Sequence, residues 1–140
     1  MITNSVTRNP NNLLAGLTPS FTGWNINPGT NANLVNELTT VLTTSGVQTN
    51  ATDSIIKYDL GVSKRVIIGV IRGTVVTSSA MKIQLSDDDA AWEFCAISAS
   101  NSTASKNING IGKGRYIEIT FLATAAGNTI ADMSLRVYRI

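Results

Sequence analysis

From residue 55 onward, the chain consists of short runs in which hydrophobic and polar positions follow the two-residue period of β-strands. Residues 81–85 (MKIQL) and 117–121 (IEITF) alternate apolar and polar side chains, which is typical of strands with one face in water. Residues 66–71 (VIIGVI) show no polar alternation and predict a central strand covered on both faces. Gly, Ser, Asn and Asp separate the runs. The expected strands lie near residues 55–60, 65–72, 80–86, 92–98, 115–122 and 133–140.

The first part of the chain has a different pattern. Residues 1–32 have no sustained period and contain all three prolines, so they predict a loop-rich N-terminal arm that could include a short edge strand. A short helix is predicted next, because Leu34, Leu38, Val41 and Leu42 are spaced as on one helical face. Threonines between these positions weaken that helix.

Length and composition favour a single domain over residues 1–140, since a 43% hydrophobic share supports a packed core. The charged share is 14%, and Lys and Arg are scattered with one adjacent pair, Lys64-Arg65, so a nucleic-acid partner is not expected. The longest apolar run is far shorter than the roughly 20 residues that cross a bilayer, so no membrane partner is expected. The single cysteine, Cys95, and the lack of a signal-peptide pattern indicate synthesis in the cytoplasm.

Candidate catalytic chemistry is sparse. The chain contains no histidine, which removes the commonest general base and the commonest metal ligand. Nothing in the sequence marks a catalytic carboxylate pair, so we expect a protein that is not an enzyme. The run Asp87-Asp88-Asp89 is open to two interpretations, a cation site or a turn that an aspartate caps, of which we prefer the second. Trp92 is expected in the core, because it alternates with Phe94 on one strand face.

Four motifs occur in a fixed order along residues 55–140. Asp59-Leu60-Gly61 follows an isoleucine-rich strand, and residues 81–88 end in a Ser-x-Asp turn before a tryptophan. Residues 114–119 (GRYIEI) and 135–138 (LRVY) come later. This order resembles the discoidin-like domains, also called coagulation-factor type C domains, of the galactose-binding-like group. The resemblance implies an all-β fold, an antiparallel jelly-roll β-sandwich of eight strands whose loops at one end bind the ligand.

The resemblance also bears on metal binding. Discoidin-like lectins often hold Ca²⁺ between an Ala-x-Asp-Gly loop and a glutamate in the closing strand. In this chain Asn36-Glu37 replaces the Asp-Gly pair and Ser134 stands where the glutamate would be. We therefore expect no metal and no cofactor.

Three residues are candidates for binding a ligand or partner. Asn36 lies in the segment that resembles the family's Ala-x-Asp-Gly loop. Arg72, before Gly73, resembles an arginine with which fucose-binding relatives donate paired hydrogen bonds to sugar hydroxyls. Trp24 lies in the early loop, where its indole could stack on a sugar or cover the end of the core, and both interpretations stay open.

Two functions fit these observations. A compact, weakly charged, jelly-roll domain is typical of virion proteins, so we expect a non-catalytic structural or attachment subunit of a virus particle, such as a phage capsid-decorating or tail protein. Its partners would be other virion proteins or copies of itself in a homo-oligomer, and its location the virion. The alternative is a soluble carbohydrate-binding, lectin-like module with glycans as partners, which the resemblance implies.

Overall fold

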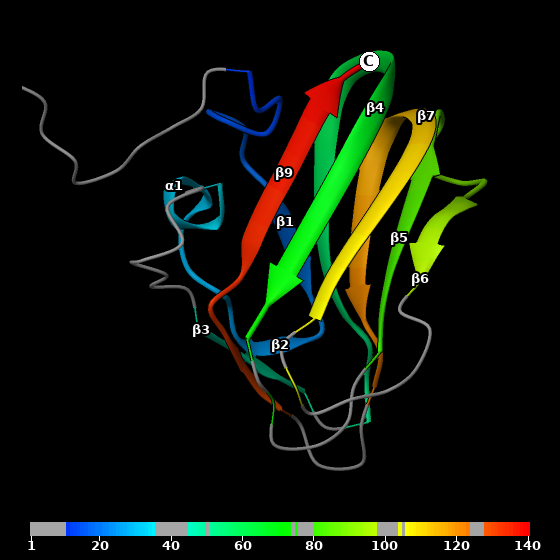
Figure 1. The fold of residues 1–140 in the computed structure, drawn as a ribbon. Coiled ribbons are helices and arrows are strands. Elements are labelled where there is room, and N and C mark those ends of the chain that lie inside the picture. Colours follow the sequence, from blue (N-terminus) through cyan, green and yellow to red (C-terminus); the bar gives the residue numbers. More distant parts are fainter. Residues whose placement is uncertain are drawn as a thin grey trace, which may run out of the picture.

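The computed structural model describes residues 11–35, 45–49, 51–73, 75, 80–97, 104, 106–123 and 128–140 (Figure 1). Its regular structure is almost entirely antiparallel β-sheet, which confirms the predicted all-β class. One short helix, α1 (Asn31–Leu34), occurs in these ranges, and no helix there is long and apolar enough to cross a membrane. The strands are β1 (Ser20–Thr22), β2 (Trp24–Ile26), β3 (Ser45–Gln48), β4 (Ser54–Arg72), β5 (Met81–Ser86), β6 (Glu93–Ile97), β7 (Lys106–Phe121), β8 (Thr129–Ala131) and β9 (Ser134–Arg139).

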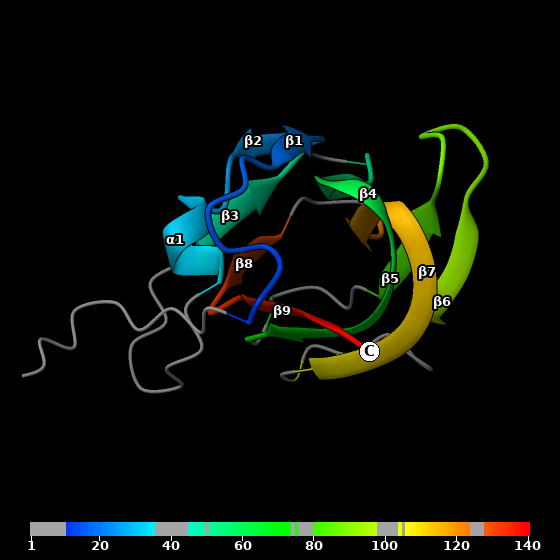
Figure 2. The same ribbon diagram turned by 90° about the horizontal axis from the view of Figure 1, so that it is seen from above.

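The two longest strands, β4 and β7, pair with each other and bend together, so that each contributes to two layers (Figure 1). In the first layer, residues 54–59 of β4 pair with residues 116–121 of β7, and β1, β5 and β6 extend this half. In the second layer, residues 64–72 of β4 pair with residues 106–114 of β7, and β9 pairs with the other edge of β4. Viewed from above, β4 and β7 curve from one side of the molecule to the other (Figure 2). A small separate sheet contains β2, β3 and β8.

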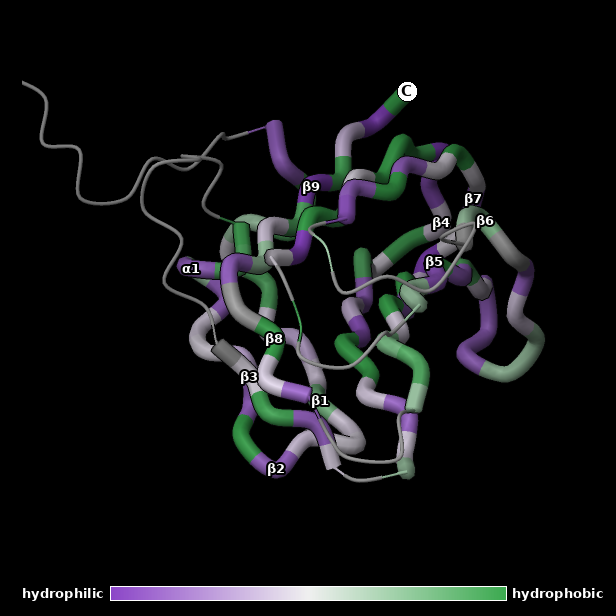
Figure 3. Tube along the Cα trace, turned by 60° about the horizontal axis from the view of Figure 1, so that its bottom comes forward, coloured by the Kyte–Doolittle hydropathy of each residue, from purple (hydrophilic) through white to green (hydrophobic). Residues whose placement is uncertain are grey.

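The core lies between the layers, because apolar residues alternate with polar ones along the strands and the apolar side chains are buried. Figure 3 shows the alternation of hydrophobic and hydrophilic residues along the trace. Burying these side chains removes apolar surface from water, which is the main force that holds the layers together. The fully buried apolar side chains include Leu14, Leu34, Ile56, Tyr58, Ile68, Met81, Ile83, Ile117, Ile119, Phe121, Ile130, Leu135 and Val137.

Close approach of the layers depends on glycines of β7 that face the first layer. A Cβ atom on Gly110 would overlap Sγ of Cys95 and lie 2.9 Å from that residue's carbonyl oxygen. One on Gly112 would lie 2.5 Å from Cδ1 of Leu85, and one on Gly114 would lie 3.0 Å from Cβ of Leu85. The second layer can therefore pack onto the β5–β6 hairpin only where β7 lacks side chains.

Two of the sequence motifs meet at the bend of β4 and β7. The Asp59 carboxylate accepts a hydrogen bond from the Gly61 N–H at 2.7 Å, and Gly61 has a φ of 85°, which glycine adopts readily. The Arg115 guanidinium forms a bidentate pair with the same carboxylate, at 2.7 and 2.8 Å. It also lies 4.9 Å from the ring centroid of Tyr116. The Asp-Leu-Gly and Arg-Tyr motifs thus hold together the two strands that turn from one layer into the other.

Replacing Asp59 by asparagine should flatten the dependence of stability on acid pH. Hydrogen bonds lower the pKa of Asp59 to about 2, and those from Arg115 contribute more than the one from the Gly61 N–H. Because the pKa in the folded state is depressed, the stabilisation is present above the unfolded value of about 3.9 and is lost as the pH falls through about 2. Urea titrations between pH 5 and pH 2 should therefore show a steeper loss for the wild type than for Asp59→Asn. Arg115→Gln should flatten the same window, and an unchanged slope in both variants would contradict this account.

The segment before α1 packs on the sandwich. The Asn12 side chain is buried, donates to the Leu135 carbonyl at 3.0 Å and accepts from the Val137 N–H at 3.2 Å. The buried Tyr58 hydroxyl donates to Oδ1 of Asn31 at 2.8 Å, and its burial raises the pKa of Tyr58. Within the expected arm of residues 1–32, the described part from residue 11 is therefore held against its own domain.

Several expected elements differ from the observed ones. Strand β7 begins at Lys106, well before the expected residue 115, because its first half has glycines where an apolar pattern would be sought. The predicted central strand has neighbours on both edges, yet its outer face is open, with Ile67 40% exposed. Trp92 is half-buried and lies outside the core, so that prediction is wrong. The expected helix corresponds only to α1, since Leu38, Val41 and Leu42 lie outside the described residues.

Candidate functional site

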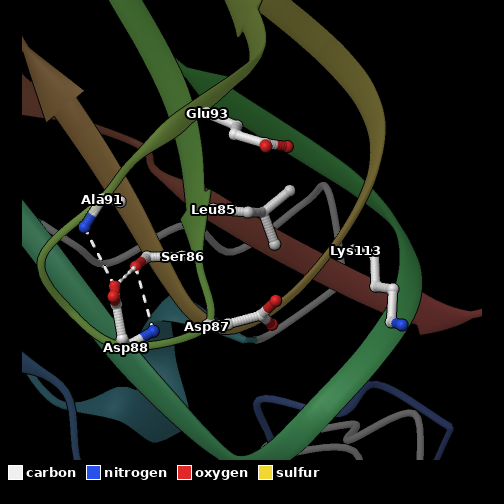
Figure 4. Close-up of a pocket in the computed structure, with 7 residues that line it drawn as sticks. All are labelled: Leu85, Ser86, Asp87, Asp88, Ala91, Glu93 and Lys113. Carbon is white, nitrogen blue, oxygen red and sulfur yellow. Dashed lines mark hydrogen bonds between the residues drawn. The ribbon is translucent and has the colours of Figure 1, made fainter.

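The turn between β5 and β6 is built around one aspartate. The Asp88 carboxylate accepts hydrogen bonds from the N–H groups of Ala90 and Ala91, at 3.0 and 2.9 Å, and from the Ser86 hydroxyl at 3.0 Å (Figure 4). These bonds lower the pKa of Asp88, and the two bonds from backbone N–H groups contribute most to this shift. The preferred interpretation of the aspartate run, a capped turn, is confirmed for this residue. Asp89 turns away and pairs with Nζ of Lys57 at 2.9 Å.

A pocket of about 240 Å³ lies beside this turn, where Lys113 of β7 comes close to the β5–β6 hairpin. We call it the turn pocket; Leu85, Ser86, Asp87, Asp88, Ala91, Glu93 and Lys113 line it (Figure 4). Lys113 comes from the second layer and the other residues from the β5–β6 hairpin, so the pocket depends on the close packing that Gly112 and Gly114 permit. Its lining joins exposed polar side chains with an apolar surface from Leu85.

The turn pocket has a net negative charge. Three carboxylates line it, those of Asp87, Asp88 and Glu93, against the single ammonium group of Lys113. Asp88 is engaged in the turn, whereas Asp87, Glu93 and Lys113 form no ion pair with any described residue. Exposed carboxylates accept and an ammonium group donates hydrogen bonds, so the pocket can bind a small ligand rich in hydroxyl or amino groups. The sequence reasoning missed Glu93 and Lys113, which are 20 residues apart on different layers.

Trp24 and Arg72, the two predicted site residues that the structure describes, do not line this pocket. Trp24 lies in β2, at the opposite end of the sandwich from the bends of β4 and β7 (Figure 1). Its ring contacts Phe121 edge-to-face with centroids 5.7 Å apart, and its N–H donates to the Ile55 carbonyl at 3.1 Å. The half-buried indole thus covers the end of the core, and a role in ligand binding stays a prediction.

Arg72 ends β4 and has no exposed surface. Its Nη1 donates to the carbonyl oxygens of Gly73 and Ala104, both at 2.9 Å, and burial lowers the pKa of the guanidinium. The side chain therefore joins the end of β4 to the connection that precedes β7, and in this geometry it presents no donor at the surface. Asn36 lies outside the described residues.

Among the described residues, no group of three His, Cys, Asp or Glu side chains is placed so that it could hold a metal ion. Ser134, which stands where calcium-binding relatives would have a glutamate, is buried at the start of β9.

Comparison with solved structures identifies the architecture. Chitosan-binding module 2 of a chitosanase/glucanase from Paenibacillus sp. IK-5, solved with chitotriose, aligns with a TM-score of 0.63 at 17% identity over 91% of this chain and 99% of the module. The Clostridium perfringens module CpGH89CBM32-5, solved with GalNAc-β-1,3-galactose, aligns with a TM-score of 0.62 at 13% identity over 89% and 96%. The fold is the galactose-binding-like jelly roll. It confirms the expected β-sandwich.

The chain also aligns with a Ruminococcus gnavus fucosidase solved with fucose, with a TM-score of 0.64 at 14% identity, over 91% of this chain but 26% of the enzyme. It thus has the size of a binding module and about a quarter of that of the fucosidase. No protein-family model and no curated protein matches the sequence. Identities this low establish the fold alone.

These comparisons correct the main functional expectation. A structural or attachment subunit of a virus particle was expected from the weakly charged surface and the jelly roll, but the structural neighbours are carbohydrate-binding modules. The error arose because a jelly roll and a low-charge surface are shared by many unrelated functions. Without a virion function, there is no longer a reason to expect virion partners, a homo-oligomer or a virion location. The comparisons favour the alternative, a lectin-like module.

Proposed function

We propose that this protein is a non-catalytic carbohydrate-binding module. The observation that carries the proposal is the alignment of 89–92% of the chain with modules that it covers over 96–99% of their length. Nearly all of this chain therefore corresponds to one whole module of this kind. The absence of histidine from the sequence supports a function without acid–base catalysis.

The turn pocket is the proposed binding site, and its charge favours an amino sugar. Three carboxylates beside one ammonium group create a negative potential that attracts a protonated amine and repels an acidic sugar. Asp87 and Glu93 are free to accept hydrogen bonds from an amino group or from hydroxyls, and Lys113 can donate to a ring or hydroxyl oxygen. A volume of about 240 Å³ has the size of one or two sugar units rather than of a long chain.

Chitotriose is the probe that tests this site. We expect the double variant Asp87→Asn/Glu93→Gln to bind chitotriose at least tenfold more weakly than the wild type, because a hydrogen bond to a charged group contributes about 1.5–3 kcal/mol net and the neutral amides keep only part of each bond. Isothermal titration calorimetry measures the loss. Fully N-acetylated chitotriose, which lacks the positive charge, should bind the wild type more weakly and should be less sensitive to the two substitutions.

The matched control is Asp132→Asn, which removes one exposed carboxylate from the turn between β8 and β9, outside the pocket. It should leave chitotriose binding unchanged. If the wild type binds no chitotriose and a screen of neutral and acidic glycans, which includes GalNAc-β-1,3-galactose and polygalacturonate, is also negative, the proposed function is refuted. If a sugar binds but the double variant binds it equally well, the function stands and the turn pocket is not its site.

A further inference from the structure

The fold collects positive charge that is scattered along the sequence. The strands of the second layer, residues 64–72 of β4, 106–114 of β7 and 134–139 of β9, contain seven of the eleven Lys and Arg residues and none of the nine Asp and Glu residues. The carboxylates that line the turn pocket belong to the β5–β6 hairpin, on the other layer. Arg72 is buried, whereas the other six cations reach the surface and give this layer a positive potential that attracts anions.

On the outer face of this layer, some of these cations lie beside exposed apolar side chains. Arg65 and Lys113 lie directly opposite each other on β4 and β7, and both are exposed. Like charges in this arrangement destabilise a sheet, and neither residue forms an ion pair with a described residue. In the next row, Tyr138, Ile67 and Ile111 lie side by side across the three strands, with the two isoleucines 40% and 61% exposed.

A second pocket opens at the edge of this face. We call it the edge pocket; its volume is about 440 Å³, and Asn11, Leu13, Tyr138 and Arg139 line it. The wall opposite β9 is fixed, because the Leu13 N–H donates to the Val137 carbonyl at 2.8 Å. The lining offers a half-buried aromatic ring, an amide side chain and an exposed guanidinium group. Aromatic rings stack on sugar rings, and a guanidinium group binds a carboxylate or sulfate in a bidentate manner.

We infer that the edge pocket and the adjoining outer face form a second glycan site, which binds an acidic polysaccharide. Tyr138 stacks on a sugar ring, Arg139 pairs with the acidic group of that unit, and Arg65 pairs with the acidic group of a neighbouring unit further along the sheet. This inference rests on the proposed carbohydrate-binding function, but it assigns a different site and an opposite ligand charge from the turn pocket. A symmetric contact between two copies through this face is disfavoured, since it would bring only positive charges together.

Polygalacturonate, a polymer with one carboxylate on each sugar, is the probe for this site. In affinity electrophoresis at low salt, the wild type should be retarded by polygalacturonate and not by its fully methyl-esterified form. The double variant Arg65→Gln/Arg139→Gln should bind polygalacturonate about tenfold more weakly than the wild type. Raising the salt concentration should weaken binding of the wild type more than that of the variant, because the variant displaces fewer counterions when it binds. Tyr138→Ala should also weaken binding, whereas Tyr138→Phe should retain most of it.

Lys82→Gln is the control for charge, because it removes a cation from β5, in the first layer, and should leave binding unchanged. No retardation by polygalacturonate, or equal retardation of the Arg65/Arg139 variant, overturns the inference. Duplex DNA or vesicles of anionic lipid that bind with the same dependence on Arg65, Arg139 and Tyr138 would overturn the assignment to a glycan. Chitotriose binding distinguishes this test from that of the proposed function. The affinity for chitotriose should be the same in the wild type and in Arg65→Gln/Arg139→Gln, so the proposal for one site can be refuted while that for the other stands.

Discussion

Replacing Trp24 by alanine is expected to lower the free energy of unfolding by about 3 kcal/mol. Its ring packs edge-to-face on the buried Phe121 at 5.7 Å, and its N–H satisfies the Ile55 carbonyl at 3.1 Å. Gly46 lets the backbone of β3 approach the ring, since a Cβ there would lie 2.7 Å from Cζ3 of the indole. Truncation therefore opens a cavity at the end of the core and leaves a carbonyl group without its donor.

Urea titrations monitored by far-ultraviolet circular dichroism measure this loss without relying on tryptophan fluorescence. Trp24→Phe keeps the ring contact and removes the N–H, so it should cost about 1 kcal/mol. Trp92→Ala is the matched control. Trp92 is half-buried outside the core, and its loss should cost clearly less than that of Trp24. If the two alanine variants lose equal free energy of unfolding, or if Trp92→Ala loses more, then Trp24 does not cover the end of the core as described.

The sequence places Trp92 in the core, whereas the structure places Trp24 over the core and Trp92 outside it, and the reason is physical. Trp92 was placed in the core by its alternation with Phe94, but the turn that Asp88 caps extends to the start of β6 and leaves Trp92 ahead of the strand. Trp24 lies among prolines and asparagines without any period. Only the long-range pairing of β2 with β3 and its contact with Phe121 place it over the core.

Elements with a clear two-residue period could be predicted, and elements shaped by packing between layers could not. Strands β5 and β9 begin and end within about a residue of the expected bounds, because one face of each is apolar and the other polar. The first half of β7 has glycines at its inner positions, where the opposing hairpin leaves no room for side chains. Such a segment carries no apolar signal, although it is paired along its whole length.

The candidate sites depend on charges that the fold brings together. The Asp-Leu-Gly and Arg-Tyr motifs could be recognised from local sequence, but their direct contact through Asp59 and Arg115 is a product of the β4–β7 register. Likewise, Arg65, Lys113 and Arg139 are far apart in sequence and gave no basic stripe, yet they belong to one layer. Spacing along the chain therefore underestimated the positive charge of this surface, and the net charge of +2 for the whole chain does not reveal it either.

A methyl group at Gly110 should destabilise the fold by about 2–3 kcal/mol, whereas the same change at Gly69 should be nearly neutral. A Cβ on Gly110 would overlap Sγ of Cys95, lie 2.9 Å from the carbonyl oxygen of that residue and lie 3.0 Å from Cβ of Ala96. Two of these obstacles are a backbone atom and a Cβ atom, so relief requires the layers to move apart and apolar contacts along the interface to loosen. A Cβ on Gly69, in contrast, points to the outer face and meets only Oδ1 of Asn109 at 3.0 Å, the tip of a side chain that can rotate away. Urea titrations of Gly110→Ala and Gly69→Ala decide the matter, and a loss at Gly110 no greater than that at Gly69 would mean that the layers are not packed as closely as the glycines imply.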